Sequence, residues 1–341
     1  MTILFIIIGV ITLLAVIGRS SIERLQIPTF KASNQIYPTG KNRVEFKSRG
    51  KTIVGNLFIP DDYKEGGKRP AMVIAPPATS LKEHAAGFYA EKFVKKGYIT
   101  LSIDTRGIGE SEGIQCDVDP YHHANDVASA VSFLESLKQV DDDKLFNVGV
   151  CAGGVASPYA TIHDKRIKAQ GLITPSIAGP ELMKSTVLPV RIIIYIVGGL
   201  FNFLKIFGLN VKLPAIPNKI PQGDSAPARG MQEISTYYLP GKVGHHERWI
   251  NNTSATSLPG VARLHIFNHA KALSSIPVVQ VVGKEAYSYE PAMRFYNMLT
   301  GTKELLEIEN TNHVDFYYKD EVGNQAVDKI DSFFKRQLNY A

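Results

Sequence analysis

A cysteine in a glycine-rich turn is the residue of this chain best suited to nucleophilic chemistry. Cys151 is the third residue of GVCAGG (149–154), which follows the apolar run 146–150 and opens a helical stretch. This strand–turn–helix context is typical of a nucleophile elbow, where a strained turn presents its central side chain above a sheet. In such a turn, side chains two positions before and after the central residue would collide with neighbouring atoms, so glycine is expected at both positions. Gly149 and Gly153 meet this requirement. We expect the helix behind the turn to lower the pKa of the thiol. The alternative is a small buried cysteine without a chemical role.

The matching general base is a histidine near the C-terminus. His313 lies in NHVDF (312–316), directly after the last expected strand. A neutral imidazole there can take the thiol proton and later activate water. The alternative is a histidine in a surface loop. The remaining histidines form no pattern typical of metal ligands, so the sequence predicts neither a metal nor a cofactor.

The acid that would orient the imidazole is less well defined by the sequence. It should follow the apolar run 278–282, because the order nucleophile, acid, histidine is that of the α/β-hydrolase fold. The usual aspartate position, three residues after Gly283, is Ala286. Glu285 is the best candidate and Glu290 the next. The alternative for Glu285 is a solvated loop carboxylate.

An oxyanion hole needs two backbone N–H groups aimed at the developing negative charge. One is expected from Ala152, the residue after the nucleophile. The other is expected from the loop 76–80 after the apolar run 71–75. Proline has no N–H to donate, so within this loop Ala78 or Thr79 is the expected donor.

The elements that must position these residues alternate along the chain. Short apolar runs bounded by turn signals predict strands, and stretches with helical spacing separate them. Such alternation predicts an α/β protein with a mainly parallel sheet built from right-handed crossovers. The expected strands are 44–47, 53–60, 71–75, 99–104, 146–150, 169–174, 277–282 and 304–309, and the expected helices are 85–96, 124–138, 291–299 and 324–338.

The alternation breaks between about residues 176 and 271, and we interpret this region as an inserted helical lid. Residues 187–208 are apolar but interrupted by Arg191 and Lys205, which favours a lid helix over a second membrane span. The lid divides the expected hydrolase core into a first part, 41–175, and a second part, 272–341.

The N-terminal segment 1–20 is predicted to be a membrane anchor. Residues 3–18 carry no charge, and sixteen helical residues span roughly 24 Å, slightly less than a hydrocarbon core of about 30 Å. No basic residue precedes the run, which argues against a cleaved signal peptide. Arg19 and Arg24 follow it, so the positive-inside rule predicts a single-pass membrane protein with a cytoplasmic catalytic domain. A signal peptide and a buried or interfacial helix remain alternatives. Residues 21–40 are expected to form a linker.

Composition narrows the function classes. The net charge of +6 is modest and no Lys/Arg run resembles a nucleic-acid-binding stripe, so no nucleic-acid partner is expected. Only two cysteines, Cys116 and Cys151, are present. A disulfide framework is therefore not expected, and a nucleophilic cysteine must stay a free thiol.

Several motifs together resemble the dienelactone-hydrolase-like branch of the α/β-hydrolases, close to the fungal polyketide transferases and thiohydrolases. The matching segments are PPATSLKE, DTRGIGESEG, GVCAGG, TYYLPGKVGHHERWINNTS, VVGKEAYS and NHVDFY, which spread over residues 44–337. The resemblance carries the family's nucleophile onto Cys151 and its histidine onto His313. Two departures are Ala286, where dienelactone hydrolases place their aspartate, and the large insertion.

These features predict a membrane-anchored hydrolase or acyltransferase that acts on an ester, lactone or thioester. Cys151 would form the acyl-enzyme, with His313 as base and Glu285 orienting it. The apolar lid favours a small-molecule substrate with a hydrophobic acyl group. The alternative is a catalytically inactive α/β-hydrolase scaffold used for binding at a membrane, which the irregular acid position motivates.

Overall fold

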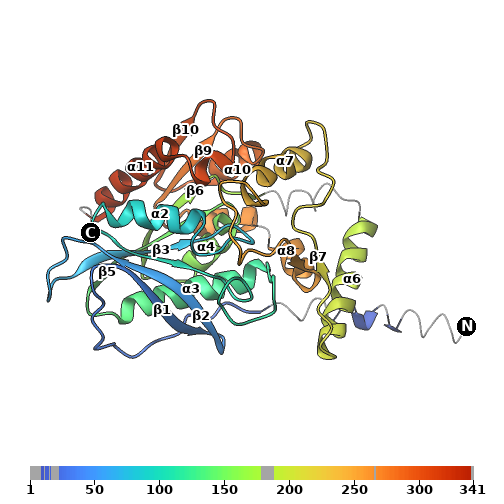
Figure 1. Cartoon of the computed structure of the whole chain (residues 1–341), viewed down its shortest axis with the longest axis horizontal. Coiled ribbons are helices and arrows are strands. Elements are labelled where there is room, and N and C mark those ends of the chain that lie inside the picture. The colour runs from blue at the N-terminus through green and yellow to red at the C-terminus, as the bar shows by residue number, and fades with distance from the viewer. Residues whose placement is uncertain are drawn as a thin grey trace, which may run out of the picture.

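The computed structural model describes residues 9–10, 12–14, 16, 23–177, 188–264 and 266–338. Its centre is an eight-stranded sheet in the order β1-β2-β4-β3-β5-β6-β9-β10 (Figure 1). β2 pairs antiparallel with both β1 and β4, and every pair from β4 across to β10 is parallel. The strands are β1 (Gly40–Ser48), β2 (Lys51–Ile59), β3 (Arg69–Ala75), β4 (Ile99–Ile103), β5 (Val140–Val150), β6 (Ile167–Ile173), β9 (Val278–Gly283) and β10 (Lys303–Ile308).

The central strands are apolar along their length because both faces of the sheet are covered. β4 and β9 are buried at every residue, as expected for parallel strands between two helical layers. The α/β-hydrolase fold class and its mainly parallel sheet, predicted from the sequence, are confirmed. β5 begins six residues earlier than predicted, at Val140, since the acidic residues before its apolar run also lie in the strand.

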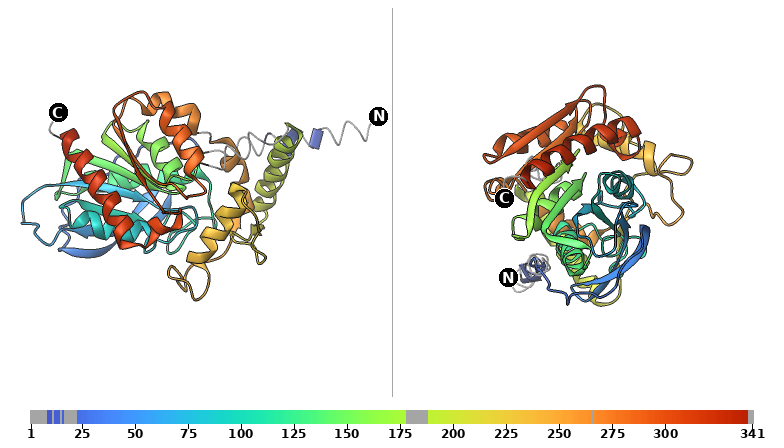
Figure 2. Two further views of the ribbon diagram at one scale, coloured as in Figure 1. Left: turned by 90° about the horizontal axis from the view of Figure 1, so that it is seen from above. Right: turned by 90° about the vertical axis from the view of Figure 1, so that its left-hand side faces the viewer.

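Helices cover the two faces of this sheet (Figure 2). α2 (Ala85–Val94) and α11 (Asp320–Leu338) pack together over one face, where Tyr89, Phe93 and Phe334 join a shared core cluster. α3 (Pro120–Ser136) and α4 (Gly153–Thr161) contact each other in a second cluster. α3 begins four residues before the predicted start, because Asp119 caps it by accepting from the Tyr121 N–H. α10 (Tyr289–Met298) packs beside β9.

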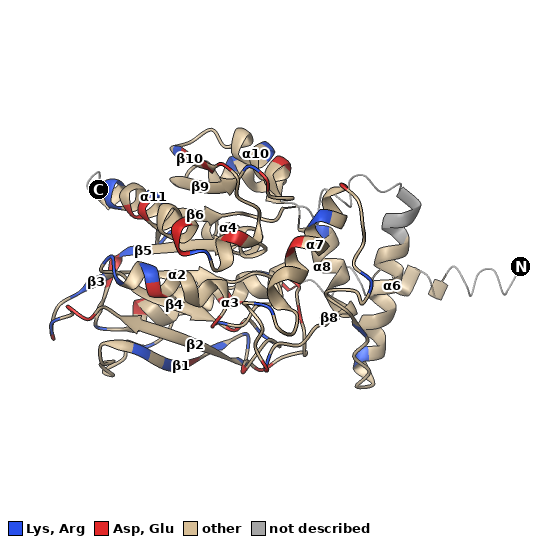
Figure 3. Cartoon of the chain, turned by 45° about the horizontal axis from the view of Figure 1, so that its top comes forward, with Lys and Arg blue, Asp and Glu red and all other residues tan. Residues whose placement is uncertain are grey.

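The described residues between β6 and β9, which we call the insert, are largely helical. α6 packs on η1 and α8, and α7 contacts η3 (Val314–Tyr317), which follows β10. Figure 3 shows little charge along the described part of α6, whose last turn carries Lys205. The insert comprises α6 (Leu188–Ile206), β7 (Lys212–Leu213), α7 (Ala226–Tyr238), β8 (Thr253–Ser254), η1 (Ala255–Ser257), α8 (Leu258–Arg263), η2 (Ile266–His269) and α9 (Ala270–Leu273). Residues 178–187 and 265 of the predicted lid lie outside the described residues.

The predicted single-pass membrane localisation is corrected by the helices themselves. Within the described residues, no helix combines the length and the apolar character needed to cross a bilayer. This finding includes α6, the segment weighed above as a second span. Of the predicted anchor 1–20, residues 1–8, 11, 15 and 17–20 lie outside the described residues, and the others are helical.

The described part of the expected linker, residues 23–39, lies against the core. The Gln26 N–H donates to the Asn125 side chain on α3 (2.8 Å), and the Tyr37 N–H donates to the Gln139 side chain (2.8 Å). Ser33 also forms an isolated bridge with Leu137. This segment therefore follows α3 along the surface of the domain.

Candidate active site

Cys151 lies in the sharp turn between β5 and α4, at the carboxyl end of the central strand. Its φ of 54° is in the left-handed region, which non-glycine residues adopt only when the surrounding structure holds them there. A side-chain carbon at Gly149 would collide with the carbonyl oxygen of Gly153, and one at Gly153 with the carbonyl oxygen of Ala75. The turn therefore has the strained geometry predicted from GVCAGG, with glycine required on both sides.

Four other loops meet this turn, because the carboxyl ends of neighbouring parallel strands lie at one edge of the sheet. They follow β3, β6, β9 and β10, which surround β5 in the strand order. Thr174, the residue directly after β6, has a φ of 39° and is a second non-glycine residue held in the left-handed region. Backbone strain at two adjacent strand ends is the kind of feature that gathers at functional sites.

His313 is fully buried in the loop after β10, and both of its ring nitrogens are hydrogen-bonded. Nδ1 lies 2.7 Å from Ser288 Oγ and 3.0 Å from Thr174 Oγ1, while Nε2 lies 3.0 Å from the Tyr317 hydroxyl. A tautomer with the proton on Nδ1 satisfies both sides: Nδ1–H donates to a hydroxyl, and Nε2 accepts from Tyr317. Burial lowers the pKa of His313 to about 3, so the imidazole is neutral.

The structure does not bring Glu285 to His313. The turn after β9 is closed by the bond from the Ala286 N–H to the Gly283 carbonyl, and the Glu285 side chain is exposed on its outer side. The hydroxyls of Ser288 and Thr174 lie beside His313 Nδ1, where the acid was expected. Glu290, the second candidate, is also exposed.

The Cys151 thiol is surrounded by hydroxyl groups. Burial raises its pKa, and hydrogen bonds with Tyr317, Tyr287, Ser176 and the Ala152 N–H partly oppose that rise. The pKa therefore moves in the opposite direction to the one expected from the helix behind the turn. The side chain is 7% exposed, and desolvation of the thiolate outweighs its donors.

Two tyrosines from two elements belong to this hydroxyl shell, and a third tyrosine packs beside them. Tyr317 comes from η3, and Tyr287 comes from the loop after β9, where its ring lies 4.5 Å from the His313 ring, centroid to centroid. Tyr238 comes from α7 of the insert, packs edge-on against Tyr317, and hydrogen-bonds through its hydroxyl to Ser80. The insert thus contributes directly to the surroundings of the thiol.

The loop after β3 runs beside the elbow. Gly153 lies so close to the backbone of Ala75 and Pro76 that a side-chain carbon at position 153 would collide with it, and this contact fixes the distance between the loop and the elbow. A turn closed by the bond from the Ser80 N–H to the Pro77 carbonyl (3.1 Å) places Ala78 and Thr79 at its tip, where both are partly exposed. The Trp249 ring of the insert donates to Thr79 Oγ1 (3.4 Å). The loop predicted to supply the second oxyanion donor therefore lies next to Ala152.

A buried charge network holds the far end of that loop. Asp104, after β4, accepts from the Lys82 backbone N–H (2.7 Å) and from its ammonium group (2.9 Å). Arg248 of the insert pairs with Glu83 (2.7 Å) and Glu110 (3.1 Å). These contacts tie the segment around Trp249 to the core.

A carboxylate on the insert clamps the two loops that carry the imidazole and its partners. Glu233 of α7 accepts from the backbone N–H of His313 (2.8 Å) and from that of Tyr287 (3.2 Å). Its side chain is 13% exposed, and burial raises its pKa while the two backbone donors oppose that rise. Sequence reasoning missed Glu233 because nothing in the spacing of α7 marks a contact with a loop eighty residues away.

Most of the other residues that sequence reasoning missed lie inside motifs already quoted, whereas Thr174 and Ser176 lie outside them. Tyr317 ends NHVDFY, Tyr287 and Ser288 end VVGKEAYS, and Tyr238 lies in TYYLPGK. Their presence in these motifs was the available signal, although spacing alone assigned them no role.

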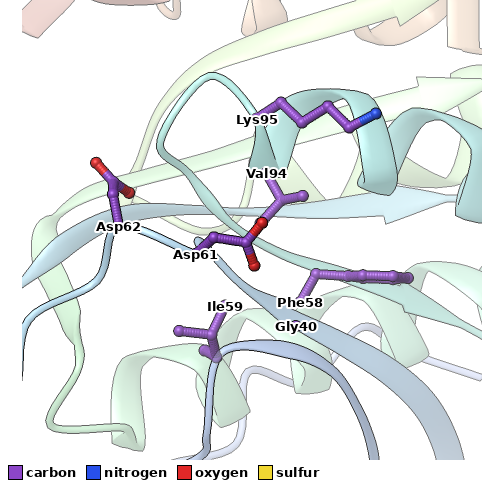
Figure 4. A pocket seen from close by; sticks show the side chains of 7 residues that line it. All are labelled: Gly40, Phe58, Ile59, Asp61, Asp62, Val94 and Lys95. Atoms are coloured by element: carbon purple, nitrogen blue, oxygen red, sulfur yellow. The ribbon is translucent and has the colours of Figure 1, made fainter.

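No group of three or more metal-ligating side chains is found in the described part of the chain. A surface depression of about 290 Å³ lies elsewhere, between the start of β1, the end of β2 and the end of α2 (Figure 4). Its lining includes Phe58, Asp61 and Lys95 and shares no residue with the elbow or its loops.

Several known proteins are similar to this chain. The family model described as X-Pro dipeptidyl-peptidase (S15 family) matches residues 50–182. The uncharacterised protein PA2218 of Pseudomonas aeruginosa is 26% identical over 87% of this chain and 80% of its own length. The thiohydrolase aneE of Aspergillus aculeatus is 25% identical, covering 80% of this chain and 86% of its own. The polyketide transferase ATR5 of Stachybotrys chlorohalonatus is 26% identical, covering 87% and 97%.

Solved structures give the same fold. The crystal structure of PA2218 superposes with a TM-score of 0.77, at 24% identity, over 92% of this chain and all of that one. The structure of DcsB in complex with its substrate analogue has a TM-score of 0.73, at 22% identity, over 87% of this chain and all of that one. The predicted relationship to polyketide transferases and thiohydrolases is confirmed, and one protein of this fold binds a small-molecule substrate analogue.

Proposed function

The chain belongs to the α/β-hydrolase superfamily, among hydrolases and acyltransferases related to fungal polyketide transferases and thiohydrolases, and we propose that it forms an acyl-enzyme on Cys151. The substrate is an ester, lactone or thioester, and His313 is the general base. The observation that carries this proposal is the strained φ of Cys151 at the end of β5, with a neutral imidazole held in the same buried cluster of loops. A cysteine that served only packing would need no such turn.

The proposed reaction has two halves. The Cys151 sulfur attacks the substrate carbonyl as its proton passes to His313, and the leaving group departs with that proton. Water or another nucleophile then attacks the acyl thioester, giving hydrolysis or acyl transfer. The Ala152 N–H, which hydrogen-bonds to the Cys151 sulfur, and that of Ala78 or Thr79, in the loop that runs beside the elbow, stabilise the oxyanion in both halves.

Ser288 and Thr174 take the orienting role that the sequence assigned to Glu285. Their hydroxyls hold Nδ1 and so leave Nε2 as the basic nitrogen. A hydroxyl cannot neutralise an imidazolium as a carboxylate can. The base must therefore act through brief proton transfer and not through a stable ion pair, which agrees with the strongly lowered pKa of His313.

The insert serves as the lid of the site in this proposal. Tyr238 and Trp249 stack on each other (5.0 Å between centroids) and hydrogen-bond to the loop after β3, at Ser80 and Thr79 respectively. These aromatic rings favour a hydrophobic acyl group. Hydrolysis of short p-nitrophenyl esters but not of longer ones would count against this substrate class.

Intact-protein mass spectrometry after incubation with acyl thioesters tests the proposal. We expect a mass increase of one acyl group in the wild type, and its absence in Cys151→Ala. Cys116→Ser is the matched control, because Cys116 is also buried and also has a thiol pKa raised by burial. An adduct that persists in Cys151→Ala and disappears in Cys116→Ser would assign the nucleophile to the wrong cysteine. Turnover that persists in both variants would remove the thiol mechanism.

A further inference from the structure

The imidazole and the thiol of this site are joined by a tyrosine hydroxyl. Tyr317 Oη lies 3.0 Å from His313 Nε2, and the same hydroxyl hydrogen-bonds to the Cys151 thiol. We propose that Tyr317 is a catalytic residue that carries the proton from Cys151 to His313 and back. This inference rests on the proposed acyl-enzyme mechanism.

Both ring nitrogens of the imidazole are hydrogen-bonded in the observed arrangement, which favours this route over a direct transfer from the thiol. A neutral imidazole has two ring nitrogens, one donor and one acceptor. Nδ1 is occupied by Ser288 and Thr174, and Nε2 is occupied by Tyr317. A proton leaving Cys151 therefore meets the Tyr317 oxygen before it can reach Nε2.

The position of Tyr317 is fixed by its own helix and by aromatic packing. η3 begins directly after His313 and ends at Tyr317, so the two side chains are four residues apart on a rigid turn. The Tyr89 hydroxyl on α2 donates to the Phe316 carbonyl (2.8 Å) and anchors this turn to the core. Tyr237 packs edge-on against the Tyr317 ring at 5.2 Å between centroids. The hydroxyl is thus held between the two groups it would connect.

The proton transfer balances without any other reactant. The Cys151 S–H bond and the Tyr317 O–H bond break, while a new O–H forms on Tyr317 and an N–H forms on His313 Nε2. The products are a thiolate, an imidazolium and a neutral tyrosine. Burial raises the pKa of Tyr317 well above its ordinary value, so a free phenolate is inaccessible and the two transfers occur together. The new O–H then points at the sulfur and stabilises the thiolate.

Tyr287 provides a matched comparison within the same shell. Its hydroxyl also hydrogen-bonds to the Cys151 thiol, but its other partner is Ser176 Oγ (3.1 Å) and not an imidazole nitrogen. Tyr287→Phe therefore removes a hydroxyl from the thiol and leaves the connection to His313 intact. Tyr317→Phe removes a hydroxyl and breaks that connection.

The experiment measures single-turnover acylation of Cys151 by an acyl thioester in light and heavy water. Because general acid–base catalysis contributes about 10²–10⁴-fold, we expect Tyr317→Phe to slow acylation about 100-fold or more. Tyr287→Phe should slow it by less than about tenfold, since it removes one thiolate donor of ordinary strength. In mixtures of light and heavy water, the wild-type rate should depend on two transferred protons and the Tyr317→Phe rate on one. A purely structural hydroxyl would not change that number.

Three results would overturn the relay. These are an acylation rate in Tyr317→Phe within threefold of wild type, equal losses in Tyr317→Phe and Tyr287→Phe, or faster acylation in Tyr317→Phe, which would make the hydroxyl a block. If Tyr317→Phe does not fold, 3-fluorotyrosine at position 317 keeps the ring and hydroxyl but is more acidic. A relay then changes the acylation rate and its solvent isotope effect, and a structural hydroxyl changes neither. Acylation that survives in Cys151→Ala would instead refute the acyl-enzyme proposal itself.

Discussion

Removing the Glu233 carboxylate should destabilise the protein and disorder the imidazole of His313, although Glu233 lies on the insert. The side chain accepts from the backbone N–H of His313 at 2.8 Å and from that of Tyr287 at 3.2 Å. A hydrogen bond to a charged group contributes about 1.5–3 kcal/mol, and an N–H left buried without a partner costs about 1–3 kcal/mol. The second bond is the longer and the carboxylate keeps some exposure, so we expect Glu233→Ala to cost about 2–4 kcal/mol in the free energy of unfolding.

The assay is urea unfolding followed by far-ultraviolet circular dichroism, alongside the rate of Cys151 acylation. Acylation should fall more than stability alone explains, because the loops freed by Glu233→Ala also carry Ser288, the partner of Nδ1. Glu233→Gln should give an intermediate loss, since the amide keeps one acceptor oxygen for its two donors.

Glu285→Ala is the matched control, because Glu285 is an exposed glutamate in a neighbouring loop. A surface substitution of this kind changes stability by about 0.5 kcal/mol or less. Equal effects of Glu285→Ala and Glu233→Ala on stability would refute the clamp. A large loss of acylation confined to Glu285→Ala would restore Glu285 as the orienting acid.

Three further predictions follow from contacts around the site. Gly149→Ala should lower the free energy of unfolding by about 3 kcal/mol or prevent folding, because its new methyl group collides with the backbone of the elbow, and overpacking costs about 1–3 kcal/mol even against movable side chains. Expression level and thermal melting measure this effect. Burial lowers the pKa of His122, but its 2.6 Å contact with the Asp117 carboxylate outweighs burial and raises that pKa to about 9. A raised histidine pKa stabilises the fold fully below pH 6.5, and the contribution is lost as the pH rises through about 9. In His122→Gln, the free energy of unfolding in urea should therefore decrease less between pH 7 and 10 than in the wild type. An equal decrease in both proteins would show that the His122–Asp117 pair is not its cause. Arg248→Gln should loosen the insert over Thr79 and raise the rate at which iodoacetamide labels Cys151, and added salt should mimic it because Arg248 is partly exposed.

Local patterns in the sequence were sufficient for the fold and for the backbone of the site. Apolar runs of strand length predicted the parallel strands, because a strand covered on both faces must be apolar throughout. GVCAGG predicted the turn at Cys151, because a side chain at Gly149 would collide with the backbone of Gly153, only four residues further along the chain. The boundaries were less accurate where a cap lay outside the apolar pattern, as at Asp119 before α3.

The tertiary structure decided which groups face the imidazole and the thiol. Ser288 and Thr174, not Glu285, hold His313 Nδ1, because the turn after β9 points the glutamate outward. It also decided the direction of the thiol pKa, since burial raises that pKa by more than the hydrogen bonds around the sulfur lower it. The order of residues along a chain encodes strands and turns, whereas hydrogen bonds between loops separated by over a hundred residues depend on how strand ends converge. Hence the sequence determined the turn that presents the Cys151 sulfur, and only the folded arrangement determined that the Tyr317 hydroxyl hydrogen-bonds to His313.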